Sequence, residues 1–218
     1  MSAPEMPPAA LREAVLRDLR PVQPLRAPFL RAVPLFLLAV LSIALQPALL
    51  GVRGDASALG VFLLWGLSAG QWLLGCLLLA AALREAVPGR SLPLARSLLV
   101  LAVLLVVLVT TLTAFASATT YAPRHFRFFW MACFAGSTLI GAPLLGLAVW
   151  LALRAYPLRP SLVGALAGLG AGLVSDAGWR TFCHIADPRH VLSAHGAAVA
   201  ALGAGGALLA TFLWRRRR

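Results

Sequence analysis

The chain has 218 residues, of which 61% are hydrophobic and 12% charged, and its mean hydropathy is +0.88. Soluble domains carry about 25% charged residues, so this composition excludes a water-soluble fold of this length. The net charge of +12 is compatible with nucleic-acid binding. The arginines, however, lie between hydrophobic blocks rather than along one polar face, so we expect no direct contact with nucleic acid.

An amino-terminal arm, residues 1–32, precedes the first apolar block. A short helix is predicted over Leu11–Arg20, where Glu13 and Arg17 form an i, i+4 pair. One stripe of this helix is apolar and consists of Leu11, Val15 and Leu19. Two prolines then predict an extended segment over Arg20–Leu25. Such an arm can lie on the membrane interface or dock its apolar stripe into the groove of a partner, and the composition favours neither.

Six apolar blocks approach the length of about 20 residues that a helix needs to cross the hydrocarbon core. Inside a bilayer such segments must be helical, because only a helix satisfies its own backbone polar groups there. A second apolar block follows the first, so we interpret the first as a retained helix rather than a secretory signal. The predicted spans are Val33–Leu50, Ala58–Leu83, Ser97–Ala118, Met131–Leu153, Ser161–Trp179 and Gly196–Trp214.

The orientation follows from the arginines between these blocks. Fourteen of them fall on the side of the two termini and five on the other side. The positive-inside rule therefore predicts that both termini are cytoplasmic. The expected fold is an all-α membrane protein, a bundle of six transmembrane helices over residues 33–214, with a basic cytoplasmic tail over residues 215–218.

Small residues recur in the last two predicted spans. The fifth carries glycines at every fourth position, and the sixth has three glycines close together. This spacing lets two helix backbones approach closely in lipid, so we expect these two helices to pack together. The glycines are Gly164, Gly168 and Gly172 in the fifth span, and Gly203, Gly205 and Gly206 in the sixth.

Two of the three cysteines fall at the predicted outer face of the membrane. Cys76 lies within the second span and is interpreted as a small buried hydrophobic residue. Cys133 opens the fourth predicted helix and Cys183 follows the fifth. Thiols at the same depth can meet, either as a disulfide in an exported compartment or as ligands of a soft metal.

Other metal-ligand types follow Cys183 in the segment predicted to join the fifth and sixth spans. They are His184, Asp187, His190 and His195, and the remaining histidine, His125, lies in the other large outer loop. Cysteine, histidine and aspartate on one face can bind zinc or a heavier thiophilic ion. The spacings match no zinc signature, so a metal site here is a hypothesis beside that of a redox pair.

Ionisable residues within the spans are few. Asp176 and Arg180 lie one turn apart near the outer end of the fifth span, and we interpret them as a structural pair. The sequence contains no G-x-S-x-G, H-E-x-x-H or phosphate-loop motif. We therefore expect neither an enzyme nor an ion-coupled transporter.

Three segments are informative when taken together. The arm reads DLRPVQPLRAP, Cys133 is followed by a run rich in small residues that ends at Pro143, and LRPSLVGALAGLGAGL precedes Cys183. In these features the chain resembles the NrsF-type family of membrane-embedded bacterial anti-sigma factors. That family has a helix before a proline-punctuated RPVxPL and a glycine-rich helix before a second cysteine. The second and third apolar blocks match it only in hydrophobicity.

The resemblance implies a mechanism at the bacterial inner membrane. The arm would hold an extracytoplasmic-function sigma factor away from RNA polymerase, and Cys133 and Cys183 would report thiol or metal stress from the periplasm. No resident cofactor is implied, beyond transient binding of a thiophilic metal ion. The residues expected to contact the sigma factor are Leu11, Val15, Leu19, Arg20, Pro21, Val22, Pro24 and Leu25.

One departure from the family pattern concerns the signal. The family usually has an aromatic-rich segment after the second cysteine, where this chain has His190 and His195. This difference favours a metal over an oxidant. The alternative function is a periplasm-facing, metal-handling membrane enzyme or transporter built on the same cysteines and histidines.

Overall fold

The computed structural model describes residues 8–18, 27–90, 126–185 and 187–217, together with positions 97, 101 and 108. In these ranges the chain is all-α, and two short π-helical segments, η1 (Phe62–Gly66) and η2 (Val191–Gly196), interrupt it. The α-helices are α1 (Ala9–Asp18), α2 (Pro28–Leu50), α3 (Ala56–Val61), α4 (Leu67–Glu85), α6 (Phe126–Leu153), α7 (Pro160–Phe182), α8 (Pro188–His190) and α9 (Ala197–Arg215).

Five stretches of the described chain are long and apolar enough to cross a membrane. They confirm an all-α, multi-pass membrane protein and coincide with five of the six predicted spans. The five stretches are Phe29–Leu50, Leu59–Glu85, Arg127–Leu153, Pro160–Phe182 and Pro188–Arg215.

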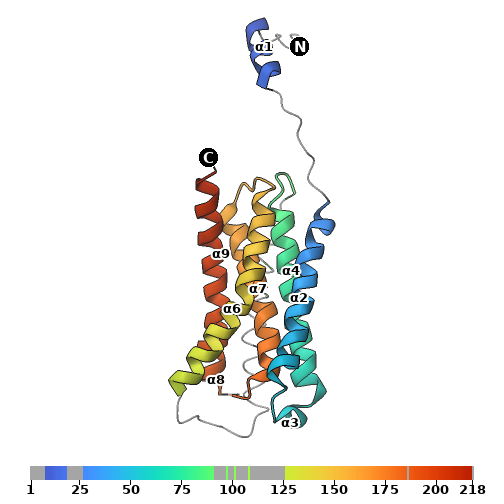
Figure 1. Ribbon diagram of the computed structural model, residues 1–218, viewed down its shortest axis with the longest axis vertical. Coiled ribbons are helices and arrows are strands. Elements are labelled where there is room, and N and C mark those ends of the chain that lie inside the picture. Colours follow the sequence, from blue (N-terminus) through green and yellow to red (C-terminus); the bar gives the residue numbers. More distant parts are fainter. Residues whose placement is uncertain are drawn as a thin grey trace.

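The third predicted span, Ser97–Ala118, lies outside the described residues except at three single positions. His125 also lies outside the described residues. The helices on either side of it are informative. The helix α4 ends at the end of the bundle where α2 begins, whereas α6 begins at the opposite end (Figure 1). The chain between Arg90 and Phe126 therefore connects opposite ends, and a sixth span in it stays a prediction.

Four helices begin earlier than their apolar blocks indicated. Prolines start α2 at Pro28, α7 at Pro160 and α8 at Pro188, because the first turn of a helix leaves its N–H groups unpaired and tolerates proline. The helix α6 begins at Phe126, five residues before the predicted start. The segment Arg180–His195 was expected to be a loop, which is wrong: a helix resumes at Pro188.

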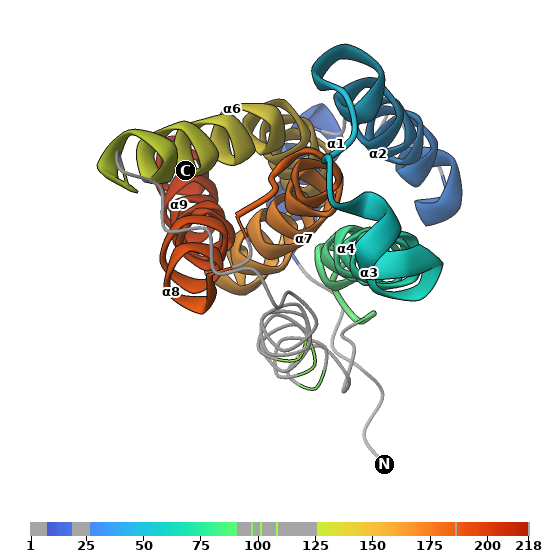
Figure 2. The same ribbon diagram turned by 90° about the horizontal axis from the view of Figure 1, so that it is seen from below.

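The helix α7 is the central element of the bundle. It contacts α2, α4, α6 and α9, and Figure 2 shows it surrounded by the other long helices. Its membrane-crossing window is 78% buried, against 17–39% for the other four spans. A glycine-rich helix in this position lets several neighbours approach its backbone at once.

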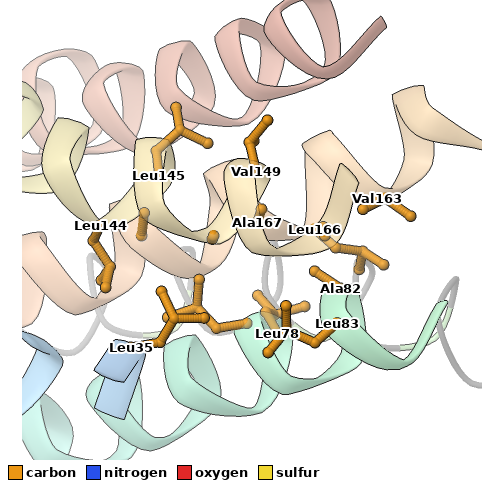
Figure 3. Packing of buried hydrophobic residues seen from close by; sticks show 14 of the residues in the cluster. Leu35, Leu78, Ala82, Leu83, Leu144, Leu145, Val149, Val163, Leu166 and Ala167 are labelled. Carbon is orange, nitrogen blue, oxygen red and sulfur yellow. The ribbon is translucent and has the colours of Figure 1, made fainter. Parts of the chain in front are cut away.

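The predicted close packing of the last two spans is confirmed. A Cβ atom added at Gly168 would lie 2.0 Å from the carbonyl oxygen of Leu202, and one added at Gly164 would lie 2.1 Å from that of Gly206. Backbone thus meets backbone along the α7–α9 seam. Beside it, leucine, valine and alanine side chains of α2, α4, α6 and α7 form the main core, which includes Leu35, Leu78, Leu144 and Leu166 (Figure 3).

The bundle has two distinct ends. At the first, which we name the arm end, side chains contact residues from other helices: Arg31 donates to the carbonyl oxygen of Leu151 (2.6 Å), Arg217 donates to that of Leu153 (3.3 Å), and Arg159 lies 3.9 Å from Glu85. The opposite end, which we name the cysteine end, includes Arg53, Cys133, Thr181 and Cys183, and the Arg53 N–H donates to the carbonyl oxygen of Thr181 at 2.9 Å.

Candidate functional site

Cys133 and Cys183 meet at the cysteine end. Their Sγ atoms are 3.6 Å apart, and each residue is 5% exposed. A disulfide requires about 2.05 Å between the sulfurs, so both are free thiols here. Cys133 lies about two turns inside α6 rather than opening the helix, and Cys183 follows the last residue of α7. Residues fifty positions apart are therefore in contact, as their common depth indicated.

Two histidines complete the group. The Nε2 atom of His190 is 3.6 Å from the Sγ atom of Cys183. Ligand atoms of Cys133, Cys183, His190 and His195 all lie within 4.8 Å of one another, and all four residues are buried. We refer to these four residues as the Cys–His cluster. It joins α6, the α7–α8 connection and the start of the last span.

The π-helical segment η2 explains why both histidines belong to the cluster. On a regular α-helix, residues five apart point about 140° away from each other. In η2, backbone hydrogen bonds run from residue i to i+5, so residues five apart come close together. The ring centroids of His190 and His195 are accordingly 5.4 Å apart.

A second layer of polar groups lies behind His195. The Nδ1–H of His195 donates to Oδ1 of Asp176 at 2.7 Å, and Gln71 Nε2 donates to Oδ2 of the same carboxylate at 2.7 Å. Arg180 instead donates to the carbonyl oxygen of Leu63 at 3.2 Å. Asp176 is therefore hydrogen-bonded to α4 and η2, and Arg180, one turn away on α7, also interacts electrostatically with its carboxylate.

Aromatic and apolar side chains enclose the cluster. Ile185 and Ala194 are buried against the two cysteines, with Phe129, Trp130 and Trp179 packed beside them. Trp130 Nε1 donates to the hydroxyl of Ser193 at 3.0 Å, which connects α6 to η2. The thiols are thus shielded from bulk water. Water therefore competes less with a metal–ligand bond or a thiol exchange at these sulfurs.

His184 and Asp187 are the two sequence candidates that stay apart from the cluster. His184 is exposed. Asp187 caps α8 by accepting a hydrogen bond from the Arg189 N–H at 2.7 Å. Conversely, Gln71 and Asp176 were not among the predicted site residues. Their position inside the spans was the available signal, because buried polar groups need partners.

The arm is described only in part. Leu11 and Val15 lie on α1 with more than half of each side chain exposed, next to the equally exposed Leu16. Arg17 and Glu13 form the predicted pair at 2.8 Å. The other expected contact residues, Leu19, Arg20, Pro21, Val22, Pro24 and Leu25, lie outside the described residues.

Comparison with known proteins adds one finding. A family model described as NrsF, negative regulator of sigma F, matches residues 16–215. No curated protein and no solved structure matches the chain. The matched range includes both cysteines of the cluster and the proline-punctuated part of the arm, while Leu11 and Val15 precede it.

Proposed function

The chain belongs to the NrsF family of negative regulators of a sigma factor, and from this premise we propose that it is an anti-sigma factor of the bacterial inner membrane. The arm binds an extracytoplasmic-function sigma factor on the cytoplasmic side. A thiol or metal stress signal acts on Cys133 and Cys183 at the periplasmic face and releases the sigma factor. The family match favours this regulator over a metal-handling enzyme or transporter.

The observation that carries the proposal is the separation of two functional regions across one bundle. The arm leads into α2 at the arm end (Figure 1). The helix bounds place four arginines at this end, one each beside the ends of α2, α6, α7 and α9: Arg31, Arg154, Arg159 and Arg215. The cysteine pair lies at the other end of the same helices. Arginine-rich ends face the cytoplasm in multi-pass proteins, which supports cytoplasmic termini and periplasmic cysteines.

The described part of the arm suits a binding segment. Leu11, Val15 and Leu16 are exposed on a ten-residue helix with no buried residue. Three exposed aliphatic side chains on one short helix are the pattern of an amphipathic ligand for a hydrophobic groove. A sigma factor that covers them removes that apolar surface from water.

Contacts between α7 and α2 supply a route from the cysteines to the arm. Cys183 follows α7, and about two turns earlier the carbonyl oxygen of Ser175 accepts a hydrogen bond from Gln46 of α2 at 3.3 Å. Gly178 lies against the same glutamine. Altered bonding at Cys183 moves the end of α7, and α2 carries that movement to the arm if the α2–α7 contact has two stable arrangements.

Capture of the sigma factor tests the proposal. Full-length protein in membrane vesicles is mixed with the extracytoplasmic-function sigma factors of its own genome, and the bound fraction is measured after sedimentation. We expect one of them to bind. Leu11→Asp or Val15→Asp should weaken binding by about 10–100-fold, since each removes an aliphatic side chain that the bound sigma factor would cover.

Ala10→Asp is the matched control. It adds the same carboxylate on the other side of α1 and should leave binding within about threefold of the unaltered protein. Absence of binding by any of these sigma factors, with the protein shown to be folded in the vesicles, would sink the proposal. Equal losses in all three variants would show that the apolar stripe is not the contact surface.

A further inference from the structure

The geometry of the Cys–His cluster points to a binding site for one divalent thiophilic ion, of the zinc, cobalt and cadmium class, held by Cys133, Cys183, His190 and His195 and positioned by Asp176. The site deepens the proposed function, because it specifies the chemistry of the signal at the cysteines. Binding itself requires no sigma factor.

The distances between the ligand atoms fit a tetrahedral ion. With bonds of about 2.3 Å to sulfur and about 2.0–2.1 Å to nitrogen, such an ion places two sulfurs about 3.8 Å apart and a sulfur and a nitrogen about 3.6 Å apart. The two sulfurs are 3.6 Å apart, and Cys183 Sγ is 3.6 Å from His190 Nε2. The remaining ligand-atom pairs lie within 4.8 Å, so small side-chain rotations close the site.

His195 is oriented as a metal ligand. Its Nδ1–H donates to Asp176, which leaves the lone pair on Nε2. That Nε2 atom is buried and has no hydrogen-bond partner in the part of the chain that the structure describes. A carboxylate that fixes the tautomer of a ligating histidine is the usual outer arrangement of a zinc site. Gln71 in turn fixes the carboxylate through its hydrogen bond to Oδ2.

The charges at this end of the bundle balance when the ion is bound. Two thiols and two neutral imidazoles form two metal–sulfur and two metal–nitrogen bonds with the divalent ion, and the two thiol protons leave to solvent. The site is then neutral. Asp176 has Arg180 one turn away, and Arg53 pairs with Asp55 at 2.7 Å. A buried site without net charge avoids the desolvation penalty of an isolated ion.

Cobalt(II) titration of the reduced full-length protein in detergent tests the inference. We expect one ion per chain, with the visible absorption of tetrahedral cobalt and a thiolate-to-cobalt charge-transfer band. Each loss of a ligand should weaken binding by more than about 100-fold, because loss of a residue that only positions a ligand already costs up to about 100-fold. The variants are Cys133→Ser, Cys183→Ser and His195→Gln. Binding without the charge-transfer band, or unchanged in these variants, would overturn the site.

Two further comparisons separate coordination from a general effect on folding. His184→Gln and Asp187→Asn change ligand types in the same segment that lie outside the cluster, and both should bind cobalt as the unaltered protein does. Asp176→Asn should keep the stoichiometry and the tetrahedral spectrum while weakening binding by about 10–100-fold. If Asp176→Asn binds with unchanged affinity, Asp176 has no positioning role.

Alkylation of the unaltered protein needs no variant at all. With a maleimide exposure long enough to label both buried thiols of the metal-free protein, Zn²⁺ should slow the labelling of Cys133 and Cys183 and leave labelling of Cys76 unchanged, as read by mass spectrometry. Equal labelling of Cys133 and Cys183 with and without Zn²⁺ would overturn the inference. Because no sigma factor is present, such a failure would leave the proposed anti-sigma function standing.

Discussion

At the residue scale, the Arg53–Asp55 pair holds the loop beside the Cys–His cluster. Arg53 is 5% exposed and donates to both carboxylate oxygens of Asp55, at 2.5 and 2.7 Å. Its backbone N–H also donates to Thr181, two residues before Cys183. This loop therefore fixes the end of α7 from which Cys183 projects.

Loss of the Asp55 charge should destabilise this end. We expect Asp55→Asn to lower the free energy of unfolding by about 1–3 kcal/mol at neutral pH, because a buried guanidinium loses its charged acceptor. The hydrogen bond from Arg53 holds the pKa of Asp55 below its ordinary value of 3.8. The stabilisation that the ion pair supplies is then complete above pH 3.8. It disappears as the pH falls through the lower pKa that Asp55 has in the folded protein.

The measurement is thermal unfolding in detergent, followed by tryptophan fluorescence at neutral pH and at about pH 3. The difference in Tm between the unaltered protein and Asp55→Asn should shrink at the acidic pH, because the stabilisation from the Asp55 charge begins to be lost once the pH falls below the ordinary value of 3.8. A difference of the same size at both pH values would contradict the role assigned to the ion pair.

Single residues also show how far the sequence could predict the site. Cys133 and Cys183 could be placed together because each adjoins the same end of a long apolar block, which fixes its depth. His190 and His195 could not be separated from His184 and Asp187, because all four appeared to lie in one loop. The burial of His190 and His195 depends on a helix that begins at Pro188.

At the element scale, the π-helical segment η2 is the feature that no apolar pattern indicates. Its wider turn brings His190 and His195 together, whereas α-helical periodicity would separate them. The helix starts at Pro28, Pro160 and Pro188 were also missed, because polar and aromatic residues continue these helices beyond the hydrocarbon core. The length of an apolar block matches the thickness of the hydrocarbon core, and a helix can extend beyond that core at either end.

The seam between α7 and α9 makes a prediction at this scale. Gly168→Ala should destabilise the protein by at least about 1–3 kcal/mol, because its Cβ would meet the backbone of Leu202, which cannot rotate away. Gly205→Ala is the matched control on α9, since a Cβ there has nothing within 4 Å. Alanine is the better helix former, so Gly205→Ala should be neutral or stabilising.

Thermal unfolding of the two purified variants checks this prediction. The Tm of Gly168→Ala should fall well below that of the unaltered protein, and the Tm of Gly205→Ala should not fall. Similar values for the two variants would show that the backbone contact across the seam contributes little.

At the scale of the whole molecule, the five spans within the described residues connect an arm at one end to a thiol cluster at the other. Composition and hydropathy predict this organisation, because the length of an apolar helix is set by the bilayer. They do not predict which helix is central. That role of α7 follows from its glycines, which bring α9 and α4 against its backbone, at Gly168 and Gly170 respectively.

The central position of α7 gives the account its mechanism. Cys183 follows α7, and the same helix contacts α2, which leads to the arm. A change in the bonding of Cys133 and Cys183 therefore acts on α6 and α7, and each of these two helices contacts all the other described spans. Joining the two thiols draws the sulfurs from 3.6 Å to about 2.05 Å.

Retention of the sigma factor before and after the thiols are joined tests this account most directly. Vesicles with full-length protein and bound sigma factor are treated with diamide, which takes up the two thiol hydrogens and becomes a hydrazine while the disulfide forms. Mass spectrometry confirms the Cys133–Cys183 bond. We predict that most of the sigma factor leaves the vesicles, and that a Cys133→Ser, Cys183→Ser double variant retains it. Full retention by vesicles in which the disulfide has formed would contradict the account.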